Sequence, residues 1–171
     1  CEVAIVGGGP AGLMAAETLA RHGRSVDLFD AMPSVGRKFL LAGKGGLNLT
    51  HAEPTPVFVG RFGDRAHEVG AWLQHWGADQ VRAWAEGLGM STFVGTSGRV
   101  FPNEMKAAPL LRAWLHRLRH ARTPVQFHMR HRWTGWNLQG DITFAAPEGE
   151  VCVQAKAVVL ALGGGSWARL G

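Results

Sequence analysis

Long apolar runs and paired cysteines are what this sequence lacks. No run reaches the roughly eighteen apolar residues that mark a membrane span, and the stretch from Val3 to Val6 is too short for a signal peptide. Cys1 and Cys152 form no CxxC pair, so neither a redox dithiol nor a zinc cluster is indicated. We expect a cytoplasmic protein with no membrane partner and no metal site, in which Cys152 is a small core residue.

Glycine, in contrast, is abundant. The chain has 24 glycines among 171 residues, well above the usual share of about 7%, and they gather at positions 7–12, 36–46 and 163–165. This clustering predicts one ligand that backbone approaches closely from three directions. The composition, 46% hydrophobic, is sufficient for a globular core.

The chain opens with the pattern of a strand, a tight turn, a helix and a second strand. A buried-strand run at Val3–Val6 precedes a helical period, Gly23 is placed to end that helix, and residues Ser25–Asp30 alternate as a strand. The apolar residues of the helical period are Leu13, Ala16, Leu19 and Ala20. Together these segments predict a right-handed βαβ unit with parallel strands.

Further along, no period holds from Pro33 to Thr50, which predicts a functional loop with one helical turn at Arg37–Leu41. Residues 51–98 read as an insertion with two short amphipathic helices, and we favour core packing over a stacking platform for Trp72, Trp76 and Trp84. A helix is predicted at Glu104–Ala121, with Leu110, Leu111, Trp114, Leu115 and Leu118 on one face.

Strand patterns dominate the end of the chain. A VQFHM strand precedes a small antiparallel meander near residues 132–138, 141–144 and 151–154, and Ala157–Leu162 is a buried-strand run. The fold class predicted is α/β, a Rossmann-type domain with a parallel sheet, a β-meander crossover and an inserted mainly helical segment at 51–98. We expect residues 1–171 to be the N-terminal part of a longer protein.

The strongest motif is a GxGxxG fingerprint in Gly7-Gly8-Gly9-Pro10-Ala11-Gly12, placed between the first strand and the helix. Gly7 permits the tight turn, Gly9 lets backbone approach a pyrophosphate, and Gly12 allows close packing of helix and strand. The free N–H groups of the helix N-terminus would face the diphosphate. This context predicts a dinucleotide site.

Asp30 ends the second predicted strand, eighteen residues after Gly12. A carboxylate there accepts hydrogen bonds from the ribose hydroxyls of an adenosine and repels a 2′-phosphate, which disfavours NADP. The alternative is an aspartate that caps a turn at Ala31–Ser34. Beside the fingerprint, we favour the ribose role.

The loop after Asp30 distinguishes an FAD site from an NAD site. Arg37 and Lys38 are placed to reach the diphosphate, and the GKGGLNLT loop offers groups for a ribityl chain or flavin edge. These candidates are Gly43, Lys44, Gly45, Asn48 and Thr50. A plain NAD dehydrogenase would not need such a segment, so we favour FAD.

Four ordered motifs, GGGPAGLMAA, GRKFLLAGKGGLNLTH, GRVFPNEMKAAPLL and VVLALGGGSWARLG, span nearly the whole chain. In them the chain resembles the BaiN and YhiN-like, aminoacetone-oxidase-type family of FAD-dependent oxidoreductases. The resemblance implies that the final LALGGG turn lies against the flavin nucleotide and that Trp133 stands where the family has a valine whose backbone meets adenine. The positions it matches to FAD contacts are Gly7, Gly9, Gly12, Asp30, Arg37, Lys38, Asn48, Gly163 and Gly164, with Ala161 in the same final turn.

Two departures from the family pattern indicate a divergent subgroup with its own substrate. Leu162 replaces the usual threonine, and the arginine and cysteine of the family's SGGGRCN loop are absent from residues 42–48. No catalytic residue can therefore be carried over from the family. Lys44 is a candidate cation beside the flavin, and a solvent-facing lysine is an equal alternative.

The function predicted is an FAD-dependent oxidoreductase that takes electrons from NAD(P)H and acts on an unidentified small molecule. One alternative is an NAD-dependent dehydrogenase. Another is an RNA-directed flavoprotein or RNA-binding module that uses residues 112–132, where six arginines and four histidines gather. We favour a solvated helix face there, with Arg112, His116, Arg119 and Arg122 in solvent, and expect no nucleic-acid partner; the oligomeric state stays open.

Overall fold

The computed structural model describes residues 1–42 and 45–164. The chain divides into two compact units, the first made of Cys1–Leu41 with Leu115–Gly171 and the second of Ala42–Trp114. Each unit has its own architecture.

Within the described residues, the first unit is built on a four-stranded parallel sheet in the order β10-β1-β2-β6. The strands are β1 (Val3–Val6), β2 (Val26–Asp30), β6 (Gln126–Met129) and β10 (Ala157–Leu160). β1 pairs with β2 and with β10, and helix α1 (Pro10–Arg21) connects β1 to β2. The predicted βαβ unit and the α/β Rossmann-type fold are confirmed.

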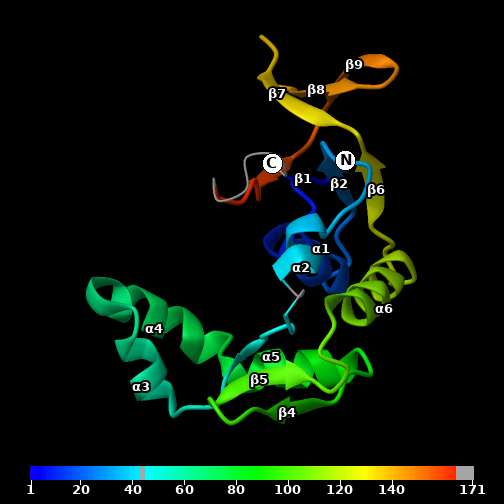
Figure 1. Cartoon of the computed structure of the whole chain (residues 1–171). Coiled ribbons are helices and arrows are strands. Elements are labelled where there is room, and N and C mark those ends of the chain that lie inside the picture. Colours follow the sequence, from blue (N-terminus) through cyan, green and yellow to red (C-terminus); the bar gives the residue numbers. More distant parts are fainter. Residues whose placement is uncertain (43–44, 165–171) are drawn as a thin grey trace. The chain divides into compact units, whose positions relative to one another are not determined.

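Different layers cover the two faces of this sheet. A meander of β7 (Arg132–Trp136), β8 (Ile142–Ala146) and β9 (Gly149–Val153) is antiparallel, as predicted, and lies on one side of the sheet, with α1 on the other (Figure 1). The core toward the meander consists of Ala4, Val6, Phe29, Ile142 and Phe144. Because side chains alternate along a strand, Ile5 of β1 is left to face α1, where its side chain lies close to Gly12.

Helix α1 ends as its sequence predicts. Gly23 has a left-handed φ of +72°, its N–H donates to Ala20 O at 3.0 Å, and the N–H of Arg24 donates to Leu19 O at 3.0 Å. This is the Schellman arrangement, which satisfies carbonyls that the helix leaves free. Near the same end, Glu17 is only 3% exposed and accepts a hydrogen bond from Arg117 at 2.9 Å.

Helix α6 (Ala107–Arg119) is shorter than the predicted 104–121 because Met105 adopts a left-handed φ of 60° just before it. Its predicted apolar face is buried at Leu110, Leu111, Trp114 and Leu118, and Leu115 is half-buried. The predicted solvated face is also confirmed, since Arg112, His116, Arg119 and Arg122 are exposed.

The second unit contains the two helices predicted from the 51–98 pattern, α4 (Ala66–His75) and α5 (Ala78–Gly87). It also contains helix α3 (Thr55–Gly60), a 3₁₀ turn at Gly63–Arg65 and a three-stranded antiparallel sheet in the order β3-β5-β4. Those strands, β3 (Thr50–His51), β4 (Thr92–Val94) and β5 (Arg99–Pro102), were not predicted. β3 and β4, of two and three residues, are too short to display an alternation. Helix α2 (Arg37–Ala42) corresponds to the predicted helical turn.

Two sequence predictions about burial were wrong. Cys152 lies on β9, at the edge of the meander, and is exposed. Trp72 and Trp76 of α4 are 69% and 41% exposed, whereas Trp84 packs edge-on against Trp114 with ring centroids 4.7 Å apart. Alternation and helical period show which residues share a face, but they do not show whether another element covers that face.

Within residues 1–42 and 45–164, no helix has both the length and the apolar character that a membrane crossing requires.

The stacked rings of Phe29 and Phe144, with centroids 4.3 Å apart, predict where the meander is most sensitive to mutation. Phe144 is fully buried, so Phe144→Ala should destabilise the protein by about 3–5 kcal/mol, because apolar surface is no longer buried and a cavity remains. Urea unfolding monitored by circular dichroism measures this change. Leu138→Ala, at a fully exposed turn residue of the same meander, is the control and should stay within about 0.5 kcal/mol of the unchanged protein. Equal effects of the two substitutions would contradict the described packing.

Candidate functional site

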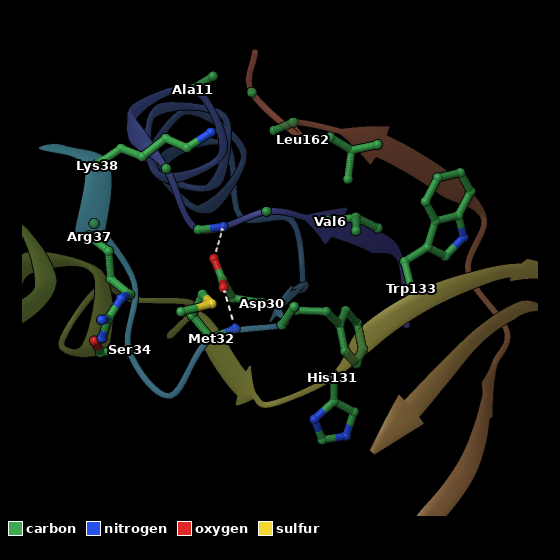
Figure 2. Close-up of a pocket in the computed structure, with 18 of the residues that line it drawn as sticks. Val6, Ala11, Asp30, Met32, Ser34, Arg37, Lys38, His131, Trp133 and Leu162 are labelled. Atoms are coloured by element: carbon green, nitrogen blue, oxygen red, sulfur yellow. Dashed lines mark hydrogen bonds between the residues drawn. The ribbon is translucent and has the colours of Figure 1, made fainter. Parts of the chain in front are cut away.

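The candidate site is a cavity of about 360 Å³ in the first unit, at the carboxyl ends of its parallel strands (Figure 2). Open α/β sheets bind ligands in this position, where the connections leave the strand ends. Predicted residues that line it are Gly7, Gly8, Gly9, Pro10, Ala11, Asp30, Arg37, Lys38, Trp133, Ala161 and Gly163. The structure therefore brings together residues that are more than 150 positions apart in the sequence.

Three glycines of the fingerprint are required by packing. A Cβ added at Gly7 would collide with the carbonyl of Ala161, and Gly7 has a φ of +106° that L-residues rarely adopt. A Cβ at Gly8 would collide with Val35, and one at Gly12 with the carbonyl of Gly7. Gly12 thus serves helix–strand packing, as predicted, and does not itself line the cavity.

Gly9 is different, because no atom of a described residue lies within 4 Å of its would-be Cβ. Its φ of −79° is open to any residue, so neither strain nor packing requires glycine there. Gly9 is also the N-cap of α1 and supplies no side-chain cap to the first turn. The helix N-terminus thus presents uncapped N–H groups beside free space, which suits an anion such as a diphosphate.

Asp30 closes β2 and binds two segments of backbone. Its Oδ2 accepts a hydrogen bond from Gly8 N–H at 2.7 Å and its Oδ1 accepts one from Met32 N–H at 2.8 Å, the two dashed bonds in Figure 2. The turn-capping alternative is therefore present in the structure. It does not exclude a ribose contact, because an ionised carboxylate has about four acceptor positions and only two are used here.

Two cations of α2 flank the glycine turn. Arg37 and Lys38 both line the cavity, and the Nζ of Lys38 donates to the carbonyl of Gly164 at 3.0 Å. The Nε of Arg37 is buried and has no hydrogen-bond partner among the described residues. A buried donor without a partner is costly, so an anionic ligand oxygen at this place would remove that cost.

An aromatic end of the cavity was only partly predicted. Trp133 lines the cavity as expected. Its ring is held by neighbours on the same strand, since Nε1 donates to Gly135 O at 2.9 Å and the ring meets Trp136 edge-on with centroids 4.8 Å apart. His131, Arg132, Met32 and Phe29 also line the cavity and were missed. The signal that could have located His131 and Arg132 is their position directly after the VQFHM strand, since parallel strands end at one edge of the sheet.

The remaining predicted positions lie elsewhere. Gly45, Asn48 and Thr50 belong to the second unit and do not line this cavity, and Thr50 pairs with Val100 in the sheet of that unit. Gly43 and Lys44 lie outside the described residues.

Comparisons with known proteins agree with this geometry. The chain is 47% identical over 56 residues to the ribosomal RNA dihydrouridine synthase of Haemophilus influenzae (strain ATCC 51907 / DSM 11121 / KW20 / Rd), a match that covers 33% of this chain and 14% of that protein. The open conformation of a flavocytochrome c3 fumarate reductase is 20% identical with a TM-score of 0.73, and covers 95% of this chain and 33% of its own.

A second solved structure, the 3-ketosteroid-delta4-(5alpha)-dehydrogenase of Rhodococcus jostii RHA1 in complex with 4-androstene-3,17-dione, is 16% identical with a TM-score of 0.64. It covers 93% of this chain and 45% of that chain, so the sequence spans less than half of each of these proteins. At such identities the two structures establish the fold alone, which is that of a Rossmann-type domain.

The family described as the HI0933-like protein Rossmann domain matches residues 1–171, the full length given. This match confirms the family resemblance that the four motifs indicated, and the chain belongs to the HI0933-like family as its Rossmann domain.

Proposed function

We propose that this chain is the FAD-binding part of an FAD-dependent oxidoreductase, in which the cavity of the first unit holds the adenosine diphosphate half of the cofactor. The observation that carries the proposal is the open space at Gly9, beside the uncapped N-terminus of α1. Gly9 follows Gly8, whose N–H donates to the Asp30 carboxylate. A diphosphate fits the first group and ribose hydroxyls fit the second.

The charges of the cavity support this orientation. Arg37 and Lys38 sit on α2, at the side of the glycine turn, where they would balance the two negative charges of a diphosphate. The partnerless Nε of Arg37 would gain an acceptor there. Bound FAD supplies hydride and electron transfer at its flavin ring, while the protein supplies binding, orientation and electrostatics.

We extend the proposal to the parts of the site outside this cavity. Gly43, Lys44, Gly45, Asn48 and Thr50 would serve the ribityl chain or flavin edge, Gly164 would accompany Gly163 at the nucleotide, and residues 51–98 would be an insertion into the FAD domain. NAD(P)H as electron donor, a small-molecule substrate and a cytoplasmic location belong to the same proposal. The similarity in fold to a named fumarate reductase and a named dehydrogenase supports redox chemistry.

A second candidate function is action on RNA, which the name of the Haemophilus relative favours. The chain carries no aspartate or glutamate from Met105 to Gly140, and the exposed face of α6 and the turn after it presents Arg112, His116, Arg119 and Arg122. Such a face would attract a polyanion. This candidate is compatible with a flavin site, since it concerns the substrate and not the cofactor.

Gly9→Val tests the diphosphate position. The branched side chain would fill the space beside the helix N-terminus without touching any described residue, so the protein should fold normally and lose at least about 100-fold in FAD affinity. The flavin absorption spectrum of the purified full-length protein measures retained cofactor. A colourless wild type that binds NAD would instead support the NAD-dependent dehydrogenase.

Gly60→Val is the matched control for that substitution. Gly60 ends α3 in the second unit, and its would-be Cβ also has no described atom within 4 Å. The control should keep its full flavin complement. If Gly9→Val keeps it too, the assignment of the fingerprint to the diphosphate fails.

Asp30→Ala tests the ribose contact separately from the turn. Loss of the carboxylate should weaken ADP binding by about 10- to 100-fold, because charge-assisted hydrogen bonds are removed. The decisive comparison uses ADP and its 2′,3′-dideoxy analogue in calorimetry with both proteins. Wild type should prefer ADP, and Asp30→Ala should bind both equally. A preference that survives in Asp30→Ala would limit the residue to holding Gly8 and Met32.

Arg112→Glu combined with Arg122→Glu tests the RNA candidate. These two arginines are exposed, whereas Arg119 lies over the ring of Phe127 at 5.4 Å and is left unchanged. If RNA binds this face, affinity should fall steeply with salt, and the double variant should flatten the slope by about 0.7 for each phosphate that it no longer neutralises. Filter binding to ribosomal RNA at several salt concentrations measures the slope. No binding by wild type at low salt would eliminate this face as an RNA site, with flavin content as the control for folding.

A further inference from the structure

The third of the four ordered motifs, GRVFPNEMKAAPLL, occupies residues 98–111, and none of these residues lines the cavity of the first unit. The motif contains β5, the central strand of the sheet β3-β5-β4. β5 pairs with β3, the strand in which the GKGGLNLT loop ends. The structure therefore brings the third motif together with the loop of the second motif.

Two backbone hydrogen bonds hold this loop against the third motif. The N–H of Leu47 donates to the carbonyl of Met105 at 2.9 Å, and the N–H of Leu49 donates to the carbonyl of Val100 at 2.9 Å. Leu47 is buried, whereas Asn48, which lies between the two bonds, is exposed. Because a slip of one residue would exchange the buried and the exposed side, these bonds keep Asn48 on the open side of the loop.

Met105 makes the first of these bonds in a conformation that methionine rarely adopts. Its φ of 60° lies in the left-handed region, and its own N–H donates to Pro102 O at 2.8 Å, which closes the turn after β5. A non-glycine residue remains in this region only where its surroundings hold it, and such positions concentrate at functional sites.

The side chain of Met105 explains why glycine does not occupy this turn. Glycine would adopt the same φ without strain, but it would supply no side chain. The terminal methyl group of Met105 lies against Gly46, since a Cβ added at Gly46 would approach it to 2.7 Å. Gly46 itself has a φ of +119°, so both conformation and space require glycine there. Met105 thus holds the loop twice, by its carbonyl at Leu47 and by its methyl group at Gly46.

We propose that Met105 is a positioning residue for the flavin half of the cofactor, and that it acts through the loop at residues 45–50. It holds Asn48 and the loop backbone in place before FAD binds, so less ordering is required on binding. This inference rests on the proposed function, in which Gly45, Asn48 and Thr50 serve the ribityl chain or flavin edge.

Calorimetry of the full-length apoprotein with FAD and with ADP tests this role, because ADP lacks the ribityl chain and the flavin ring. Met105→Gly retains the turn and its carbonyl but removes the methyl group from Gly46, so FAD affinity should fall about tenfold. ADP affinity should stay within about twofold, because the cavity of the first unit is unchanged. Met105→Leu, which keeps an apolar side chain, is the conservative control and should retain FAD affinity within about threefold.

Gly46→Ala disturbs the same contact from the loop side. Its Cβ would meet the methyl group of Met105, so FAD affinity should again fall about tenfold with ADP affinity unchanged. Gly89→Ala is the matched control in the same unit. Gly89 also has a positive φ, +81°, but no described atom lies within 4 Å of its would-be Cβ, so the ratio of FAD to ADP affinity should equal that of wild type.

Near-ultraviolet circular dichroism of each variant verifies the fold. An unchanged ratio of FAD to ADP affinity in folded Met105→Gly and Gly46→Ala would overturn the positioning role and leave the proposed cofactor in place. Equal losses of FAD and ADP affinity would also contradict it, because Met105 would then serve the fold in general. A wild type that binds neither ADP nor FAD would instead refute the proposed function.

Discussion

The close approach of backbone at the turn between β1 and α1 is the constraint on which the rest of the first unit depends. The Gly7 position meets the carbonyl after β10, the Gly12 position meets the turn itself, and Gly8 lies against Val35. Two segments that are distant in the sequence, at Val35 and Ala161, therefore converge on one turn because its glycines have no Cβ atoms. Only with the turn packed this tightly do Gly9 and the N-terminus of α1 face free space.

Asp30 and Phe29 connect that turn to the rest of the unit. Asp30 carries backbone hydrogen bonds from Gly8 and Met32, so one carboxylate orders both sides of the cavity before any ligand arrives. Phe29 lines the cavity and also stacks on Phe144 of the meander and on His128 of β6, at 4.3 and 4.5 Å. The meander thereby supports the aromatic end of the site as well as the core.

The basic residues of the chain have more than one role. Arg37 and Lys38 lie at the cavity, whereas Arg117 neutralises the buried Glu17 and Arg119 covers Phe127. The basic stretch from 112 to 132 is thus partly structural and partly an exposed face. Sequence composition treats these arginines as one group, but only their surroundings in the fold separate those that fill a structural role from those available to a partner.

The sequence by itself determined the parallel βαβ unit, the meander, the apolar face of α6 and the identity of the glycine turn. These follow from local period and from backbone conformations that only glycine adopts easily. Tertiary structure alone decided that Gly9 is open, that Asp30 binds backbone as well, that Cys152 and Trp72 are exposed, and that His131 joins the cavity. The reason is physical: a pattern reports which residues share a face, while exposure and hydrogen-bond partners depend on what distant segments bring to it.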